Sequence, residues 1–463
     1  MLDRSAVNAV LNEALKTGGD YSELFMQDSD FNNIRMVDGK VDSASYQRRV
    51  GAGVRVLKGT RCAYAYTADT SEAAIMETAR AAAAAIEGVP EYSVRSFEVR
   101  KGAPGYEKKF ADVTNDMRIE LLRSGTAAAR AYSGEITQVE ANYLDADHRI
   151  MVANSNGVWA EDRRPRTRLI IETVAMNGTE AQTGYSAPGL GKGFEAYREL
   201  DPAAIGREAA RIAVTMLHAP ECPADSVPVV IESGFGGVIL HEACVHSLEA
   251  TSVGRGNSEF CGKLGQQIAS PIVTAVDDGT LPGAWGSIAY DDEGTPSRRN
   301  VLIENGILKT YLVDLLGSRR MNGHPLTGSS RRQDYTFAPT SRMTYTFFAE
   351  GMDDPEEMIR SMGEGLYAAN MGGGSVNPLT GEFNFAVLEA YWVRDGRILT
   401  PVRGATLIGK GSEVLMKIDR IANSGLALAP GMCGSASGSV PVNVGQPRIR
   451  VSEITVGGKG GKL

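Results

Sequence analysis

The stretch PVVIESGFGGVILHEACVHSLE at residues 228–249 decides the fold of the C-terminal half of the chain. Its short apolar run at 228–231 predicts a buried strand. Helical patterning follows around 235–250, so the strand leads directly into a helix. The tight connection between them is predicted from three closely spaced glycines, which are Gly234, Gly236 and Gly237.

The predicted helix carries the pattern His241-Glu242-x-x-x-His246. Only five of the 463 residues are histidine, so a chance His-Glu-x-x-x-His is rare. Two neutral imidazoles with a carboxylate beside them are what a catalytic zinc site requires, because the carboxylate can take a proton from a water at the metal. The alternative is two unrelated helix histidines, one of them buried and the other exposed.

The spacing of this histidine pair is unusual. Residues five apart lie about 140° apart around an ideal helix of 3.6 residues per turn, so they do not share a face. We therefore expect a local widening of the helix, such as a π-bulge, which is often found at functional sites.

A catalytic zinc usually takes three protein ligands, so one ligand is missing from the histidine pair. Cys433 is the leading candidate, because the small residues of Gly431-Met-Cys-Gly434 let a backbone approach closely and a thiolate binds zinc well. The sequence leaves several candidates open, which are Cys244, Glu249, Cys261, His324 and Cys433.

Composition limits the other functional classes. The net charge of −8 gives no general attraction to nucleic acid or to an anionic membrane surface. Five widely spaced cysteines do not form a disulfide framework, and the N-terminus lacks the pattern of a secretory signal. No apolar run approaches the roughly 18 residues of a membrane span. We expect a cytoplasmic protein that contacts neither nucleic acid nor membrane.

Alternating helical and strand patterns indicate an α+β N-terminal domain. The predicted helices cover 4–16, 69–88, 115–132 and 202–217. The predicted strands cover 21–27, 33–37, 41–50, 54–57 and much of 135–176, with hairpin turns at 37–40 and 155–157. Asp69 and Glu72 resemble a capping box for the second helix.

The aperiodic, proline-containing segment 218–227 predicts the domain boundary, which divides the chain into residues 1–222 and 223–463. Beyond it, short strands rich in Gly, Thr and Val predominate. Helical patterning in this half is clear only around 235–250 and 354–369. We therefore expect a mainly β domain that carries one important helix.

Several segments resemble the TldD/PmbA family of zinc metallopeptidases, specifically the TldD-type members that retain the metal motif. They include HEACVHSLE at 241–249, NPLTGEFNF at 377–385 and MCGSASGSVPVNVGQPRIRVSEITVGG at 432–458. The resemblance covers nearly the whole chain. Its most specific parts are the histidine pair and the segment around Cys433.

The resemblance implies an α+β protein with an antiparallel sheet and flanking helices in the N-terminal domain and a barrel-like, mainly β C-terminal domain. It implies one Zn²⁺ held by His241, His246 and Cys433, with Glu242 as the general base that activates water against a peptide carbonyl. It also implies a dimer, formed with a second copy or with a TldE/PmbA-like subunit, around an enclosed cavity that admits small or unfolded peptides.

A hypothesis of a different class is a peptide-binding adaptor, similar to a gyrase modulator, in which the metal is structural or absent. The chain also departs from the family pattern at three positions near the expected site. Val245 replaces a usual glycine before the second histidine, Ser435 replaces a lysine, and Tyr345 replaces a common asparagine.

Overall fold

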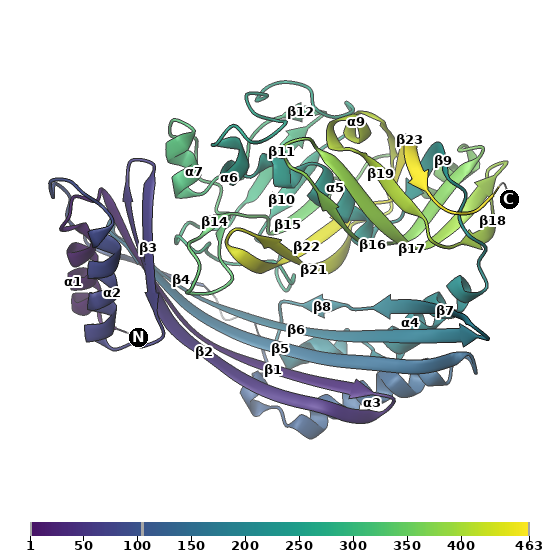
Figure 1. The fold of residues 1–463 in the computed structure, drawn as a ribbon, viewed down its shortest axis with the longest axis horizontal. Helices are drawn as coiled ribbons and strands as arrows, with labels where there is room; N and C mark the ends of the chain where they lie inside the picture. The colour runs from purple at the N-terminus through teal and green to yellow at the C-terminus, as the bar shows by residue number, and fades with distance from the viewer. Residues whose placement is uncertain (1, 103–105, 462–463) are drawn as a thin grey trace.

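A computed structural model describes residues 2–102 and 106–461 of the chain. Its N-terminal half is built on one long, curved sheet that lies beneath the C-terminal half in Figure 1. The strand order is β3-β2-β1-β5-β6-β4, with β7 and β8 also paired to β6. The strands are β1 (Tyr21–Val37), β2 (Lys40–Lys58), β3 (Arg61–Thr67), β4 (Glu98–Lys101), β5 (Ile136–Asn154), β6 (Val158–Asn177), β7 (Glu180–Ser186) and β8 (Gly189–Leu190).

The first two strands are longer than the sequence predicts. The segments 21–27 and 33–37 belong to the single strand β1, and 41–50 and 54–57 belong to β2, so the predicted breaks between them are wrong. Both neighbours of β1 pair with it along nearly its full length, which keeps its polar middle extended. The predicted turn at 37–40 is confirmed, because Val37 pairs with Lys40 across it.

Four helices pack against one face of this sheet, as Figure 1 shows. Helices α1 (Arg4–Leu15) and α2 (Glu72–Ala84) cover one end of it, and α3 (Asn115–Arg130) and α4 (Pro202–Leu217) cover the other. The predicted capping box of α2 is corrected, because the Ser71 side chain accepts a hydrogen bond from the backbone N–H of Ala74 and so caps the helix. Helices α1 and α2 bury their apolar stripes in one shared core, and α3 and α4 bury theirs in a second.

The C-terminal half contains a closed barrel. The strands follow the ring β16-β9-β23-β19-β17, and β17 pairs back to β16 to close it, which confirms the barrel-like prediction. The ring strands are β9 (Asp225–Ile231), β16 (Gly365–Val376), β17 (Glu382–Arg394), β19 (Thr406–Lys410) and β23 (Ile449–Gly457), with β18 (Arg397–Val402) and β20 (Ile418–Ile421) attached.

A second sheet stands beside the barrel, in the order β12-β11-β10-β15-β22-β21. Its strands are β10 (Ala275–Asp278), β11 (Arg299–Glu304), β12 (Ile307–Leu308), β15 (Tyr345–Phe348), β21 (Ala427–Ser435) and β22 (Gly438–Gln446), and β13 (Ser330–Arg331) pairs separately with β14 (Thr340–Ser341). The short helices are α5 (Val238–Ala243), α6 (Ala250–Val253), α7 (Leu315–Arg320), α8 (Pro355–Arg360) and α9 (Gly411–Met416).

The helix predicted over 354–369 is much shorter than expected. Helix α8 ends at Arg360, and the backbone turns at Gly363, whose φ of 75° suits glycine. Strand β16 then begins at Gly365 and pairs in parallel with β9. Barrel pairing therefore overrides the helical pattern in the second part of this segment.

Buried ion pairs join the two halves of the molecule. The Arg55 guanidinium on β2 donates to Glu23 at 2.7 Å and to Glu293 at 2.6 Å, and Arg332 donates to the other oxygen of Glu23 at 2.6 Å. All four side chains are at most a few per cent exposed. These residues come from both halves, so the network fixes how the sheet meets the C-terminal half.

No helix among residues 2–102 and 106–461 is both long enough and apolar enough to cross a bilayer. The predicted division of the chain at residues 222–223 stays a prediction.

Replacing Arg55 with methionine is expected to lower the free energy of unfolding by about 3–5 kcal/mol, because two buried carboxylates lose their shared cation. Denaturant unfolding measures the change. The control is Arg48→Met, which removes an exposed pair with Asp28 and is expected to cost at most about 1 kcal/mol. Equal losses in both variants would contradict a structural role for the buried network.

Candidate metal centre

The connection from the barrel into the motif is built by glycines, as the sequence predicts. Strand β9 ends at Ile231, and a 3₁₀ turn over Gly234–Gly237 leads into α5. Gly234 has a φ of 73°. A Cβ atom on Gly237 would lie 2.5 Å from the backbone of Gly445, so only glycine lets this turn lie against β22. The start of α5 is thereby fixed between the barrel and the second sheet.

The helix predicted over 235–250 is interrupted at Cys244. Helix α5 ends at Ala243, the backbone at Cys244 adopts φ −134° and ψ −58°, and a 3₁₀ turn runs over Val245–Leu248. The expected π-bulge is therefore wrong, and a break in the helix replaces it. Val245 has no positive φ, so the valine fits the position that the family pattern gives to glycine.

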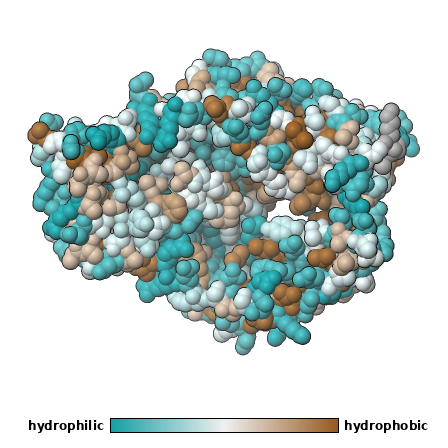
Figure 2. Space-filling model, viewed as in Figure 1, coloured by the Kyte–Doolittle hydropathy of each residue, from teal (hydrophilic) through white to brown (hydrophobic). Residues whose placement is uncertain are grey.

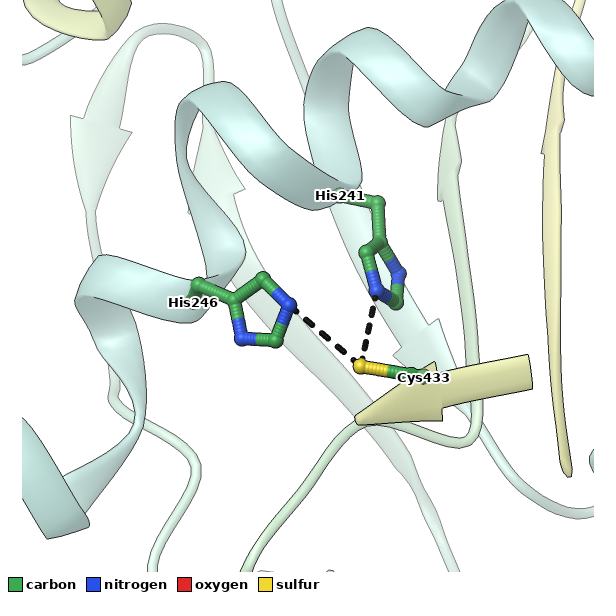
Figure 3. A group of neighbouring side chains, drawn as sticks. All are labelled: His241, His246 and Cys433. Atoms are coloured by element: carbon green, nitrogen blue, oxygen red, sulfur yellow. Dashed lines mark hydrogen bonds between the residues drawn. The ribbon is translucent and has the colours of Figure 1, made fainter. Parts of the chain in front are cut away.

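The break brings both histidines to one sulfur atom. Nε2 of His241 and Nε2 of His246 each lie 3.3 Å from Sγ of Cys433, which reaches them from β21 (Figure 3). The two rings stand nearly perpendicular, with centroids 5.0 Å apart. One nitrogen from each histidine and the sulfur all lie within 4.8 Å of one another.

This spacing suits a single metal ion. In a tetrahedral zinc site with Zn–S of about 2.3 Å and Zn–N of about 2.0–2.1 Å, sulfur and nitrogen are about 3.5 Å apart. The observed nitrogen–sulfur distances of 3.3 Å are close to this value. Two imidazoles and a thiolate are also a donor set that zinc accepts readily.

The second nitrogen of each ring has its own partner. Nδ1 of His246 lies 3.3 Å from a carboxylate oxygen of Glu249, and Nδ1 of His241 lies 3.4 Å from the Thr346 hydroxyl on β15. Such partners hold the ring and direct the other nitrogen toward a metal. Both Nε2 atoms are therefore oriented toward Cys433 and the same point.

Electrostatics make Cys433 a ready ligand. Its burial opposes ionisation, but His241 and His246 stabilise the thiolate and lower the pKa of Cys433 to about 3. Burial likewise disfavours a charged His246, yet Glu249 and Cys433 raise the pKa of His246 well above its ordinary value. The thiolate form, which binds metals, is therefore favoured at neutral pH.

Glu242 lies at the open side of the cluster. Its carboxylate is 3.6 Å from Nε2 of His246, and both residues line a pocket of about 410 Å³. The same pocket is bounded by Cys433, Glu249 and short stretches of β16 and β21. A carboxylate, a metal-ligand set and space for a substrate are thus present together.

The other candidate ligands are placed differently. Cys244 is fully buried at the helix break, and burial raises the pKa of its thiol. The Cys261 sulfur lies 3.6 Å from the Val253 carbonyl oxygen, and His324 hydrogen-bonds with Thr310. Glu249 contacts His246 but is not part of the three-atom group.

Sequence reasoning missed one residue of this site, Arg342. Its buried guanidinium donates hydrogen bonds to the carbonyl oxygens of Cys433 and Gly438, and its Nε lies 3.7 Å from Glu249. Arg342 therefore holds two parts of the site in place. One is strand β21, which carries the Cys433 thiolate, and the other is the Glu249 carboxylate, which orients His246. The only available signal is its place in the family-like stretch RMTYTFFAEG at 342–351.

The α+β fold and the cluster of two imidazoles and a thiolate define a candidate metalloenzyme, and comparison with known proteins identifies its family. Three family models match the chain. The model of PmbA/TldA metallopeptidase domain 1 matches residues 22–86, that of the central domain matches 108–217, and that of the C-terminal domain matches 224–458. The chain belongs to the PmbA/TldD family of metallopeptidases. Its membership makes it a peptidase, as the sequence predicts.

Similar proteins agree over nearly the full length. A metalloprotease TldD homolog of Haemophilus influenzae is 37% identical, over 95% of this chain and 93% of its own. A metalloprotease of Methanothermobacter thermautotrophicus is 31% identical, over 95% and 96%.

Solved structures share the fold. A proposed modulator of DNA gyrase from Thermotoga maritima is 20% identical with a TM-score of 0.79, and the match covers 98% of this chain and 99% of that one. TldE from Thermococcus kodakarensis is 18% identical with a TM-score of 0.77, covering 97% and 99%. At these identities the likeness establishes the architecture alone.

Replacing Cys433 with alanine is expected to reduce bound metal from about one ion per chain to near zero, because the soft ligand is lost. Elemental analysis after dialysis measures the content. Cys244→Ala is the matched control and should keep its metal. If Cys244→Ala lost the metal and Cys433→Ala retained it, the assignment of the third ligand would be wrong.

Proposed function

We propose that the protein is a zinc-dependent peptidase in which His241, His246 and Cys433 hold one Zn²⁺. The observation that carries the proposal is the approach of both Nε2 atoms to one sulfur at 3.3 Å. Zinc is favoured among metals because it is borderline-soft and accepts mixed nitrogen and sulfur ligands in tetrahedral geometry. Three protein ligands leave the fourth position for water or substrate, as in catalytic sites.

Zinc bound there would polarise the scissile carbonyl and make water a stronger acid. Glu242 accepts the proton of the attacking water on its carboxylate and later donates it to the leaving amine. The position of Glu242 beside His246, facing the pocket, suits this role. Glu249 keeps His246 oriented during the reaction, and Arg342 holds Glu249 and Cys433 in place.

The surroundings of the site suit an extended peptide. The walls of the pocket include Gly374 and Ser375 on β16 and Gly434 and Ser435 on β21, so little side-chain bulk blocks the backbone there. A pocket of about 410 Å³ accommodates a few residues of a peptide and not a folded domain. We therefore propose small or unfolded peptides as substrates.

A second, larger pocket adjoins the first. Figure 2 shows the surface hollowed between the C-terminal half and the strands of the N-terminal sheet. The pocket there has a volume of about 680 Å³ and runs between Tyr185 on β7 and Met371 on β16. Met432 lines both pockets. A peptide bound at the metal site can therefore extend into this hollow.

A partner subunit would complete an enclosed cavity. Met432 is 53% exposed, and Leu428 on the same strand is also exposed, so apolar side chains face outward next to the metal pocket. We propose that a second copy of the chain, or a TldE/PmbA-like subunit, covers this surface. A relative named TldE shares the fold, which supports a partner of similar shape.

We also propose that the protein is cytoplasmic and that its two domains meet at residues 222–223. All five cysteines are free thiols in the structure, which fits a reducing compartment. The net charge of −8 argues against direct contact with nucleic acid. The description as a modulator of DNA gyrase is given to structural relatives of this chain and is not carried over to it.

Glu242→Gln is expected to keep about one zinc per chain and to lower the rate of peptide hydrolysis by roughly 10²–10⁴-fold, because a general base is lost. Cleavage of an unstructured peptide, followed by mass spectrometry, measures the rate. Glu453→Gln, an exchange on the exposed surface, is the matched control and should leave the rate unchanged.

The same experiment separates the peptidase from the adaptor hypothesis. If Glu242→Gln hydrolysed the peptide at the wild-type rate, Glu242 would not be the general base. Peptide binding that a chelator does not affect, without any cleavage by the zinc-loaded wild type, would favour the adaptor.

A further inference from the structure

A small cavity between the two halves is lined by an unusual number of cations. Its volume is about 30 Å³. Arg164 and Arg166 reach it from β6 of the N-terminal sheet, and Arg331 and Arg332 reach it from β13 and the residue after it. The polar lining also includes His148 on β5, Gln27, Gln333 and one carboxylate, that of Asp292.

Two of these arginines have carboxylate partners. Arg164 pairs with Asp162 at 2.9 Å and with Asp292 at 2.8 Å. Arg332 pairs with Glu23 at 2.6 Å, but Glu23 is shared with Arg55. The acids around the cavity are therefore already engaged by cations.

The other two arginines bind only carbonyl oxygens. Arg166 donates to the carbonyls of Trp285 and Ser287, and Arg331 donates to the carbonyl of Met343. Among the ion pairs of the described residues, none joins Arg166 or Arg331 to a carboxylate. Both side chains are nearly fully buried, at 4% and 2% exposure. Asp162, Asp292 and Asp277 offset part of their charge from a longer distance. A buried guanidinium group with no directly paired carboxylate is still costly, by several kcal/mol.

His148 supplies a further donor but no negative charge. Its burial and the neighbouring Arg166 and Arg164 lower the pKa of His148, so the ring is neutral at physiological pH. Nδ1 lies 3.2 Å from the Ser29 hydroxyl, which accepts a hydrogen bond from Gln27 and can donate its own proton to Nδ1. In that arrangement Nε2 carries the ring proton.

We propose that this cavity binds one small inorganic anion of the halide class, chloride in the cell, between Arg166 of the N-terminal sheet and Arg331 of the C-terminal half. The volume suits one halide or one water molecule and is too small for a peptide carboxylate with its chain. The anion supplies the missing counter-charge and links the two halves. The site is separate from the metal ligands and independent of the proposed peptidase activity.

Crystals of the full chain grown in sodium bromide test the site directly, because bromide replaces chloride and scatters anomalously. The expected result is an anomalous peak within hydrogen-bonding distance of the Arg166 and Arg331 guanidinium groups. A cavity that holds only water, with no bromide peak, would overturn the proposal.

Thermal unfolding provides an independent readout in solution. At constant ionic strength, replacing gluconate by chloride is expected to raise the melting temperature of the wild type by roughly 2 °C or more, because the anion binds the folded state alone. Arg331→Met should remove this response. Arg166→Met is the second variant should Arg331→Met fail to fold.

Arg48→Met, a substitution at an exposed arginine on β2, is the matched control and should keep the full chloride response. The same melting temperature in chloride and in gluconate for the wild type would contradict the proposal, as would an unchanged chloride response in a folded Arg331→Met or Arg166→Met variant.

Discussion

Two imidazoles that are five residues apart cannot face one ion from an uninterrupted α-helix, since they lie about 140° apart around its axis. The break at Cys244 removes this constraint by ending α5 after Ala243 and starting a 3₁₀ turn at Val245. His246 then turns toward the sulfur that His241 already faces (Figure 3). The candidate metal centre depends on this one irregularity of the backbone.

The rest of the molecule holds the three ligand atoms in place from separate directions. The barrel presents α5 through the glycine turn after β9, and the edge strand β21 of the second sheet presents Cys433. Arg342 connects these elements by contacting both Cys433 and Glu249. The curved N-terminal sheet is joined to the C-terminal half by buried ion pairs. One of them links Arg55 on β2 to Glu293.

Local patterns in the sequence predict much of this arrangement. The histidine pair stands out because histidine is scarce, and the small residues beside Cys433 together with the family resemblance point to its thiolate. The turn at 37–40 and the four helices of the N-terminal half also follow from short-range patterns. These features depend on neighbouring residues, so their signals are contained in the sequence itself.

Other features depend on contacts between distant segments and were missed. Strand β1 stays extended through its polar middle because β2 and β5 pair with it on both sides. The segment after α8 joins the barrel because β9 offers it a partner. Arg342 and the arginines of the small cavity between the two halves resemble ordinary surface cations in sequence, and only the packing of the two halves shows that they are buried.

The central claim is that one metal ion is bound by two imidazoles and the thiolate of Cys433. Zinc K-edge X-ray absorption on the zinc-loaded protein tests it most directly, since sulfur and nitrogen ligands differ in bond length. We predict one sulfur at about 2.3 Å and two imidazole nitrogens at about 2.0–2.1 Å. A first coordination shell made only of nitrogen and oxygen would contradict the account.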